Sequence, residues 1–199
     1  MKNRNVRLAF TGKKRSGKDS AALAFINAHA FERLLFAGTL KAMIRTLLIS
    51  AGMSETEIEY YMEGDGKELP LDILQGQSCR YAMQKLGTEW RNFFGKDLWT
   101  DILIKKVEQL NEAGASWAIT DLRFLHEADW VDEQGGWKIR VIRRGQKDTA
   151  VDPHPSETEM EKINVDYTIF NHGTLADFNK VVAILADCIL NDTDLDSIA

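Results

Sequence analysis

The residues best suited to chemistry in this chain form a glycine-rich, basic loop near the N-terminus. The loop follows an apolar run at residues 6–10 and precedes an alanine-rich segment. Glycines let the backbone curl so that successive N–H groups point at an anion, and the next helix would add its positive N-terminus. The pattern predicts a P-loop that binds a nucleoside triphosphate, with Lys18 on the β- and γ-phosphates. The predicted ligands are Gly12, Lys13, Arg15, Ser16, Gly17, Lys18, Asp19 and Ser20.

The loop departs from the usual P-loop pattern at the position that normally supplies a magnesium ligand. Asp19 stands where Ser or Thr is typical, and a hydroxyl follows only at Ser20. The metal ligand would then be the Asp19 carboxylate, the Ser20 hydroxyl or a water molecule. A carboxylate beside three phosphates is repulsive unless a cation lies between them, so the substitution favours dependence on Mg²⁺.

A second candidate group follows a predicted strand at residues 117–120. Asp121 stands at the end of this strand, where a Walker-B-type acid would hold the Mg²⁺ shell; the alternative is an aspartate that caps a helix. Arg123 lies two residues further on and would bind the phosphate of an acceptor, since a guanidinium can bond two phosphate oxygens at once. The alternative for Arg123 is a surface salt bridge to Glu127.

A pair of arginines closes another predicted strand, at residues 138–144. Arg143 and Arg144 lead into residues 145–155, which have no strong helix or strand pattern. A loop that begins with two arginines is typical of a lid that brings positive charge onto a transferring phosphate. We therefore predict a lid over residues 143–160, with a solvent-exposed strand end as the alternative for either arginine.

The length and composition limit the class of protein. With 199 residues, of which 44% are hydrophobic, we expect one compact α/β domain over residues 1–199. No stretch is apolar enough to span a bilayer, and the basic N-terminus has no following apolar segment that would indicate a signal peptide. Cys79 and Cys188 are far apart and predict buried thiols in a reducing compartment. These features predict a cytoplasmic protein that is not bound to membranes.

The charge is distributed unevenly along the chain. Up to residue 45 there are ten Lys and Arg against two acids, Asp19 and Glu32, so this part carries +8 of a net charge of −5. The remainder therefore carries −13, which argues against a broad nucleic-acid surface. Basic charge concentrated around the P-loop favours a small polyanionic substrate, although a solvated charged face is the alternative for many of these residues.

Strand and helix patterns alternate along the chain. Strands separated by helical crossovers predict a five-stranded parallel sheet with helices on both faces. Ligands of such sheets bind at the carboxyl ends of the strands. The predicted strands are 6–11, 34–37, 117–120, 138–144 and 167–170; the predicted helices are 18–30, 39–51, a short one capped by Ser54, 79–86, 98–113, 124–133 and 175–190; and residues 63–77 form the best candidate for a mobile insertion.

The chain resembles the bacteriophage deoxynucleoside monophosphate kinases, within the P-loop nucleoside monophosphate kinase superfamily. The resemblance covers most of the chain and rests on six short motifs in sequence order. These are the P-loop with its Asp after Lys, Phe36-Ala37-Gly38-Thr39-Leu40-Lys41, Gln84-Lys85-Leu86-Gly87-Thr88-Glu89 with Arg91 and Trp99, Thr120-Asp121-Leu122-Arg123-Phe124, His154-Pro155-Ser156-Glu157, and Ile169-Phe170-Asn171-His172-Gly173-Thr174-Leu175.

This resemblance implies a three-layer P-loop kinase fold with a short lid, and the reaction ATP + dNMP → ADP + dNDP with Mg²⁺. It implies that adenine lies near Asn171, Gly173 and Thr174. It also implies an acceptor region at residues 38–95, to which Gly38, Thr39, Lys41, Arg80, Gln84, Thr88, Arg91 and Arg123 would contribute. A homodimer is possible by similarity, and a phage-encoded protein would work in the host cytoplasm. Where many relatives have Asn before the Glu of the third-strand motif, this chain has His126.

Two other functions remain open at this point. Animal phosphomevalonate kinases have a similar basic P-loop with Asp after Lys, so the loop alone does not separate the two substrates. The aromatic residues Trp90, Phe93 and Phe94 favour a nucleobase, which they could stack on, although we expect core packing for at least two of them. The other alternative is a regulator that binds ATP without transferring phosphate, which would not need Asp121, Arg123, Arg143 or Arg144.

Overall fold

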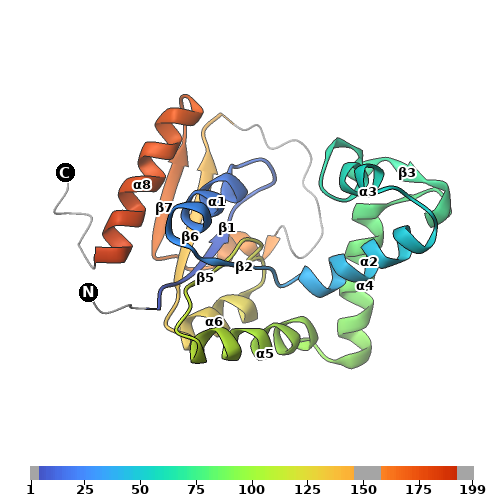
Figure 1. The fold of residues 1–199 in the computed structure, drawn as a ribbon, viewed down its shortest axis with the longest axis horizontal. Helices are drawn as coiled ribbons and strands as arrows, with labels where there is room; N and C mark the ends of the chain where they lie inside the picture. Colours follow the sequence, from blue (N-terminus) through green and yellow to red (C-terminus); the bar gives the residue numbers. More distant parts are fainter. Residues whose placement is uncertain (1–4, 146–157, 192–199) are drawn as a thin grey trace. The chain divides into compact units, whose positions relative to one another are not determined.

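The computed structural model describes residues 5–145 and 158–191, and these residues form two compact units. Within the described ranges, the first, here called the sheet unit, comprises residues 5–35, 104–145 and 158–191; the second, the helical unit, comprises residues 36–103. The boundary divides α5 (Leu98–Glu112) between them. Figure 1 labels the elements of both units.

The sheet unit contains a five-stranded, entirely parallel sheet in the order β2-β5-β1-β6-β7. Its strands are β1 (Arg7–Thr11), β2 (Glu32–Leu34), β5 (Trp117–Ile119), β6 (Trp137–Arg143) and β7 (Tyr167–Asn171). The helices α1 (Lys18–His29), α6 (Leu125–Glu133) and α8 (Leu175–Asn191) belong to the same unit. The predicted α/β class with a five-stranded parallel sheet is therefore confirmed.

Apolar side chains alternate between the two faces of the sheet, as strand geometry requires. Leu8 and Phe10 of β1 and Ile139 of β6 belong to a buried core with α1 and α8. Trp117 of β5 lies outside that core and stacks on Trp130 of α6, with ring centroids 5.9 Å apart. Helices consequently cover both faces of the sheet (Figure 1).

The second strand lies earlier in the chain than predicted. The apolar run at residues 34–37 suggested a strand there, whereas β2 ends at Leu34 and α2 begins at Gly38. Glu32 and Arg33 are exposed because β2 is an edge strand that pairs only with β5. An exposed edge strand needs no apolar run, so its pattern in the sequence is weak.

The helical unit packs three helices around a small core of its own. The helices are α2 (Gly38–Ser50), α3 (Glu55–Met62) and α4 (Cys79–Phe94). Ile44, Leu48, Ile58 and Cys79 are buried together. The segment predicted as a mobile insertion, 63–77, has regular structure here: it contains η1 (Asp65–Glu68), β3 (Pro70–Leu71), η2 (Asp72–Leu74) and the first residue of β4 (Gln77–Ser78).

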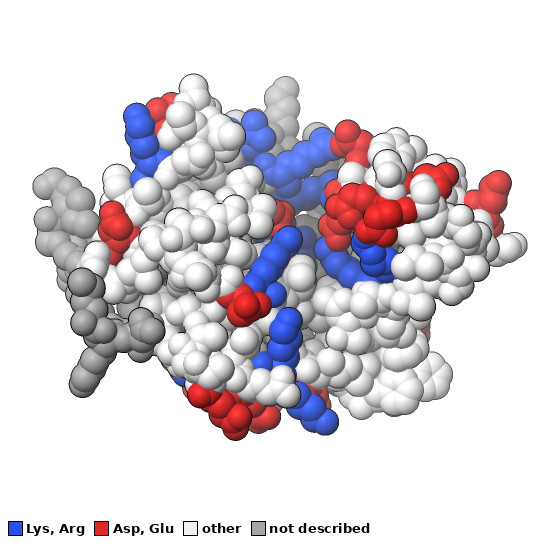
Figure 2. All heavy atoms as spheres, viewed as in Figure 1, with Lys and Arg blue, Asp and Glu red and all other residues white. Residues whose placement is uncertain are grey.

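The N-terminus of α3 carries the predicted cap. The Ser54 hydroxyl accepts a hydrogen bond from the backbone N–H of Glu57, whose carboxylate accepts one from the backbone of Ser54 at 2.8 Å. The Ser54 hydroxyl also donates to the Glu57 carboxylate at 2.6 Å, and this bond, together with the one from the Ser54 backbone, lowers the pKa of Glu57 below its ordinary value. Acidic side chains gather over α3 in Figure 2, so this helix presents a negative surface.

Helix α4 continues eight residues beyond the predicted end at residue 86, to Phe94. Gly87 lies inside the helix, where its carbonyl oxygen accepts hydrogen bonds from Arg91 Nε at 2.9 Å and Trp99 Nε1 at 3.1 Å. A Cβ at Gly87 would lie 3.5 Å from Leu40 Cδ1, in ordinary van der Waals contact. Glycine is thus tolerated in the helix because side chains from α4 and α5 reinforce its backbone.

Candidate active site

The loop between β1 and α1 has the geometry of an anion-binding turn. It begins at Gly12, with φ of +148°, and ends at Gly17, with φ of +100°, which caps the N-terminus of α1. Arg15 between them also has a positive φ, +63°. The Ser16 N–H donates to the Lys13 carbonyl at 3.1 Å, which closes the turn. The helix N-terminus and the curled backbone together form a site where an anion is favoured.

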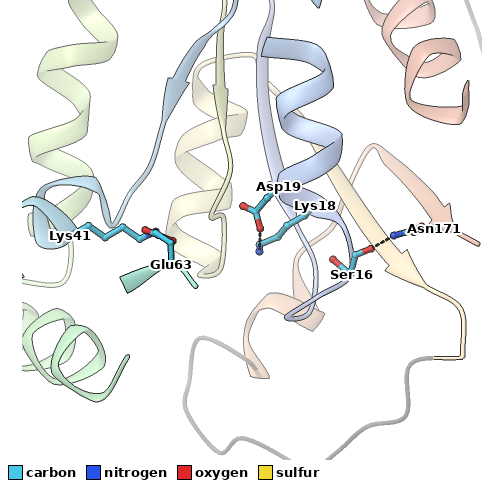
Figure 3. A network of polar contacts seen from close by, with 6 residues as sticks. All are labelled: Ser16, Lys18, Asp19, Lys41, Glu63 and Asn171. Carbon is cyan, nitrogen blue, oxygen red and sulfur yellow. Dashed lines mark hydrogen bonds and ion pairs between the residues drawn. The ribbon is translucent and has the colours of Figure 1, made fainter. Parts of the chain in front are cut away.

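Lys18 is the first residue of α1, and its side chain is largely buried. Only 9% of the residue is exposed, and Nζ lies 3.0 Å from Asp19 Oδ2 (Figure 3). The Asp19 side chain remains 56% exposed, and Ser20 is exposed as well. The ammonium group of Lys18 is therefore held by the carboxylate of the next residue. A phosphate oxygen bound in the loop would compete with this carboxylate for Lys18.

Three buried hydroxyls lie at or beside the carboxyl ends of β1 and β5. Thr11 Oγ1, Ser16 Oγ and Thr120 Oγ1 are buried and, among the described residues, have no hydrogen-bond partner. Buried polar atoms normally have a partner, so these hydroxyls are suited to a polar ligand or to water. The sequence analysis missed Thr11 and Thr120. In the sequence, each could have been recognised as a hydroxyl residue at the end of an apolar strand.

Asp121 follows β5, and the residues on either side of it bond to the two strands that flank β5 in the sheet. Thr120 N donates to the Leu34 carbonyl, and Leu122 N donates to the Phe10 carbonyl, both at 3.2 Å. Asp121 is half-buried between these two bonds, beside the end of β1. The N-cap residue of α6 is Phe124, so Asp121 does not occupy the N-cap position, and its role in a Mg²⁺ shell stays a prediction.

Arg123 lies just before α6, and its backbone N–H bonds to a residue in the first turn of that helix. The buried Glu127 carboxylate accepts hydrogen bonds from the backbone N–H of Arg123 at 2.9 Å and of Phe124 at 3.1 Å. Glu127 thus fixes the main chain at Arg123. The role of the guanidinium on an acceptor phosphate stays a prediction.

A cavity of about 330 Å³ opens beside the P-loop on the β6 side. Its lining includes three basic residues, Lys13, Arg140 and Arg143, and one acid, Glu161. Lys13 Nζ lies 2.8 Å from Glu161 Oε1. The concentration of basic side chains next to the P-loop makes this cavity suitable for an anionic group.

Arg140 is a residue that the sequence analysis missed. Its guanidinium donates to the carbonyl oxygens of Met160 at 3.1 Å and Ile163 at 2.6 Å, which ties η3 (Met160–Lys162) to the sheet. An arginine in the middle of an interior strand of a parallel sheet is unusual, because such strands are normally buried on both faces. That contrast was the available signal.

The two predicted lid arginines stand at the end of β6. Arg143 ends the strand, while the Arg144 guanidinium carbon lies 5.5 Å from the centre of the Phe170 ring. This distance fits a cation–π interaction. The predicted lid, 143–160, includes residues 146–157, which lie outside the described residues, as does the motif at 154–157.

Asn171, Gly173 and Thr174 lie where β7 leads into α8. Asn171 Nδ2 donates to the Ser16 carbonyl at 2.9 Å (Figure 3), which joins this turn to the P-loop. Gly173 has a φ of +80°. Thr174 Oγ1 accepts from the Asp177 backbone N–H at 3.2 Å and donates to its carboxylate at 2.7 Å, and this bonding lowers the pKa of Asp177. The Thr174 hydroxyl therefore serves the helix entry.

In the helical unit, the predicted acceptor ligands Gly38, Thr39 and Lys41 occupy the first turn of α2. No acidic residue stands in that turn, so the positive end of the helix is not neutralised from within it. Lys41 Nζ instead lies 2.7 Å from Glu63 Oε1 (Figure 3). Arg45, one turn further on, pairs with Glu55 of α3.

The remaining predicted acceptor residues lie along α4. Arg80 Nε is 3.6 Å from Glu68 Oε1, and Arg91 Nε donates to the Gly87 carbonyl. Gln84 and Thr88 are half-buried one and two turns after Arg80. Spacings of four residues bring Arg80, Gln84 and Thr88 to one side of the helix. Their contact with a substrate stays a prediction.

The expectation that core packing takes at least two of the three aromatic residues of α4 is wrong. Phe93 is 82% exposed and Phe94 is 68% exposed. Trp90 stacks on Trp99 with ring centroids 5.9 Å apart. The two phenylalanines lie in the last turn of α4, beyond the predicted helix end.

Comparison with known proteins decides the family. The model of the deoxynucleotide monophosphate kinase family matches residues 44–182. A protein of Acanthamoeba polyphaga mimivirus, whose name provisionally assigns it as a deoxynucleotide monophosphate kinase, is 30% identical and aligns with 92% of this chain and 96% of its own length. The chain belongs to the deoxynucleotide monophosphate kinase family.

Membership of this family makes the protein a phosphotransferase, and specifically a nucleotide kinase. The part matched by the family model includes Asp121, Arg123 and the α4 residues, whereas the P-loop and the first turn of α2 precede it. The predicted resemblance to this family is confirmed, and it implies a small nucleotide as substrate.

One solved structure supports the fold. Dephospho-CoA kinase from Campylobacter jejuni superimposes with a TM-score of 0.52 at 14% identity, over 96% of this chain and 99% of that chain. The crystal structure of TT1252 from Thermus thermophilus aligns with a TM-score of 0.47 at 15% identity, over 92% of this chain and 98% of that chain. At such low identity the first likeness shows the fold alone, which is that of a P-loop kinase. In the described ranges 5–145 and 158–191, no helix is both long and apolar enough to span a membrane.

Proposed function

We propose that this protein transfers the γ-phosphate of ATP to a deoxynucleoside monophosphate, giving ADP and a deoxynucleoside diphosphate. The observation that carries the proposal is the P-loop, in which the nearly buried Lys18 follows Gly17 at the N-terminus of α1. The name of the family supports the choice of acceptor. Phosphoryl transfer needs mainly alignment and charge neutralisation from the protein, and the basic residues around the loop are suited to both.

The donor phosphates would bind to the backbone of residues 12–20, with Lys18 on the β- and γ-phosphates. When ATP binds, its phosphate oxygens would replace the Asp19 carboxylate as the ion-pair partner of Lys18. Arg143 and Arg144 would neutralise charge on the transferring group, and Lys13 would reach the same phosphates by leaving Glu161. Electrostatic stabilisation of this kind often makes the largest contribution to catalysis.

The oxygen donors at the site fit Mg²⁺. Asp19, Ser20 and Asp121 would hold it, directly or through water, and it would supply positive charge against the phosphates. The described residues include no group of three or more His, Cys, Asp or Glu side chains close enough to hold a metal on their own. This donor set matches an ion that is bound by one or two carboxylates and completes its shell with phosphates and water.

The acceptor would bind to residues 38–95, with its phosphate on Gly38, Thr39, Lys41 and Arg123. Arg80, Gln84, Thr88 and Arg91 would contact its base or phosphate. Lys41 would leave its ion pair with Glu63 and bind the acceptor phosphate, since a dianionic phosphate is a stronger partner than a partly exposed carboxylate. Binding of both substrates would then proceed by replacement of internal ion pairs.

The proposal is tested by an assay of ADP release with ATP and Mg²⁺. The acceptors dGMP, dTMP, dCMP, dAMP, their ribose counterparts and phosphomevalonate are added one at a time. We expect turnover that depends on one or more deoxynucleotides, with no ADP release in the absence of acceptor beyond slow hydrolysis. Turnover with phosphomevalonate alone would assign the protein to that substrate. Tight ATP binding without turnover on any acceptor would indicate a regulator.

The role of Arg123 is tested by replacing it with alanine. We expect kcat/KM for the acceptor to fall about 10- to 100-fold, because a charged hydrogen bond to the phosphate is lost, while KM for ATP changes little. The fold should persist, since the bond from Arg123 to Glu127 comes from the backbone. Arg33→Ala, on the exposed edge strand β2, is the matched control. An unchanged kcat/KM for the acceptor would refute this role.

A further inference from the structure

Asn171 makes an unusual long-range contact with the phosphate loop. Its side-chain nitrogen donates to the main-chain carbonyl of Ser16 at 2.9 Å, across 155 positions of sequence. A carbonyl oxygen can only accept, so the amide must present its NH₂ group to Ser16. Figure 3 shows this side chain directed at the loop from the end of β7.

The bonded carbonyl determines how the loop presents its amides. A peptide unit is planar and trans, so the Gly17 N–H points away from the Ser16 carbonyl to which it is joined. Asn171 bonds that carbonyl from the end of β7, which directs the Gly17 N–H to the opposite side of the peptide unit. Successive amides that point into a loop are the groups that bind phosphate.

Packing makes this arrangement specific to glycine at position 17. A Cβ at Gly17 would lie 2.5 Å from Asn171 Nδ2 and 3.4 Å from Phe178 Cε1, so the asparagine amide lies directly against the Gly17 backbone. Gly17 also has a φ of +100°, which residues other than glycine rarely adopt. The space beside Asn171 and the backbone conformation at position 17 therefore both require glycine.

The sheet in turn holds Asn171 in place. Asn171 is aligned with Arg143 in the parallel pairing of β7 with β6, and its own carbonyl accepts from Arg144 N at 3.3 Å. Its backbone is thus tied to the strand that carries the lid arginines. A side chain on a backbone fixed in this way can hold a loop in one conformation at little entropic cost.

We propose that Asn171 is a positioning residue for the donor phosphates: it sets the conformation of the P-loop and does not read the nucleobase. This inference rests on the proposed function, in that it assumes the loop binds the donor triphosphate. It assigns to Asn171 a role different from the adenine contact that the family resemblance implies. The two roles predict different responses to ligands with and without a base.

The test compares ATP, GTP and inorganic tripolyphosphate, which has phosphates and no base. Asn171→Asp places an acceptor against the Ser16 carbonyl, and Asn171→Ala leaves that carbonyl without its partner. We expect calorimetric titration to show each variant binding all three ligands more weakly, by the same factor of about 10. In turnover, KM for ATP and for GTP should rise together while KM for the acceptor stays constant. His172→Ala, in the same turn, is the matched control and should bind all three as the wild type does.

Each outcome decides the assignment. Weaker binding of ATP with unchanged binding of tripolyphosphate would mean that Asn171 contacts the base, and unchanged binding of all ligands would mean that it has no role; either result overturns the proposal. Should neither variant fold, the side-chain amide signals of Asn171 in the NMR spectrum of the wild type decide. A shift with tripolyphosphate and none with adenosine supports positioning, and the reverse overturns it.

The same titrations separate this inference from the proposed function. A wild type that binds ATP and tripolyphosphate but shows no acceptor-dependent turnover would refute the kinase proposal and leave the role of Asn171 intact. A wild type that binds neither ligand would refute both, because there would be no phosphate for the loop to hold.

Discussion

Replacing Lys18 with alanine should lower kcat by about 10²–10³-fold, the usual effect of removing one preorganised group that stabilises developing charge. Lys18 is the first residue of α1 and is only 9% exposed, so its charge is held in place before any ligand binds. The partner that it leaves behind, Asp19, has a side chain that is 56% exposed and can be solvated. We therefore expect the free energy of unfolding to change little while turnover collapses.

Two further variants separate the charge of Lys18 from its packing. Lys18→Met keeps most of the side-chain volume without the charge and should be as inactive as Lys18→Ala, whereas Lys18→Arg should recover part of the activity. Lys180→Ala removes the same charge from the exposed face of α8 and should behave as the wild type. Rates are measured by ADP release with a saturating acceptor, and folding by thermal unfolding. Near-wild-type turnover in Lys18→Met would refute the proposed role of the charge.

The P-loop and the order of the elements could be predicted because their signals are local. Residues 12–20 contain within nine positions the glycines and the lysine that the loop needs, and the strand and helix patterns flank them directly. The same holds for the Ser54 cap, whose partner Glu57 is three residues away. Alternating strands and helices then lead to a parallel sheet, because parallel neighbours require crossover connections.

The features that the sequence did not predict depend on distant neighbours. The end of α4 was misplaced because the Gly87 carbonyl accepts hydrogen bonds from the side chains of Arg91 and Trp99. No local pattern in the sequence encodes these contacts. The bond from Asn171 to Ser16 joins residues at opposite ends of the chain, so only the folded sheet brings them together. Internal carboxylate partners such as Glu63 for Lys41 and Glu161 for Lys13 were missed for the same reason.

Gly12→Ala should destabilise the protein by about 2–6 kcal/mol and abolish phosphate binding. A Cβ at this position would lie 2.5 Å from the Val141 carbonyl oxygen and 2.8 Å from Ser16 Oγ. Val141 lies in the middle of β6, which pairs on both sides, so its backbone cannot move without breaking the sheet. Steric overlap of about 1–3 kcal/mol then adds to backbone strain of about 1–3 kcal/mol from a φ of +148°.

Gly135→Ala separates these two contributions, because Gly135 also has a positive φ, +64°, but nothing lies within 4 Å of an added Cβ. Its cost should be the backbone strain alone, about 1–2 kcal/mol, and it should bind ATP as the wild type does. Urea unfolding gives the two free energies and titration calorimetry gives the ATP affinities. Equal destabilisation in both variants would mean that β6 yields to the new methyl group. If Gly12→Ala also kept its ATP affinity, the close approach of the P-loop to β6 would not be a requirement for phosphate binding.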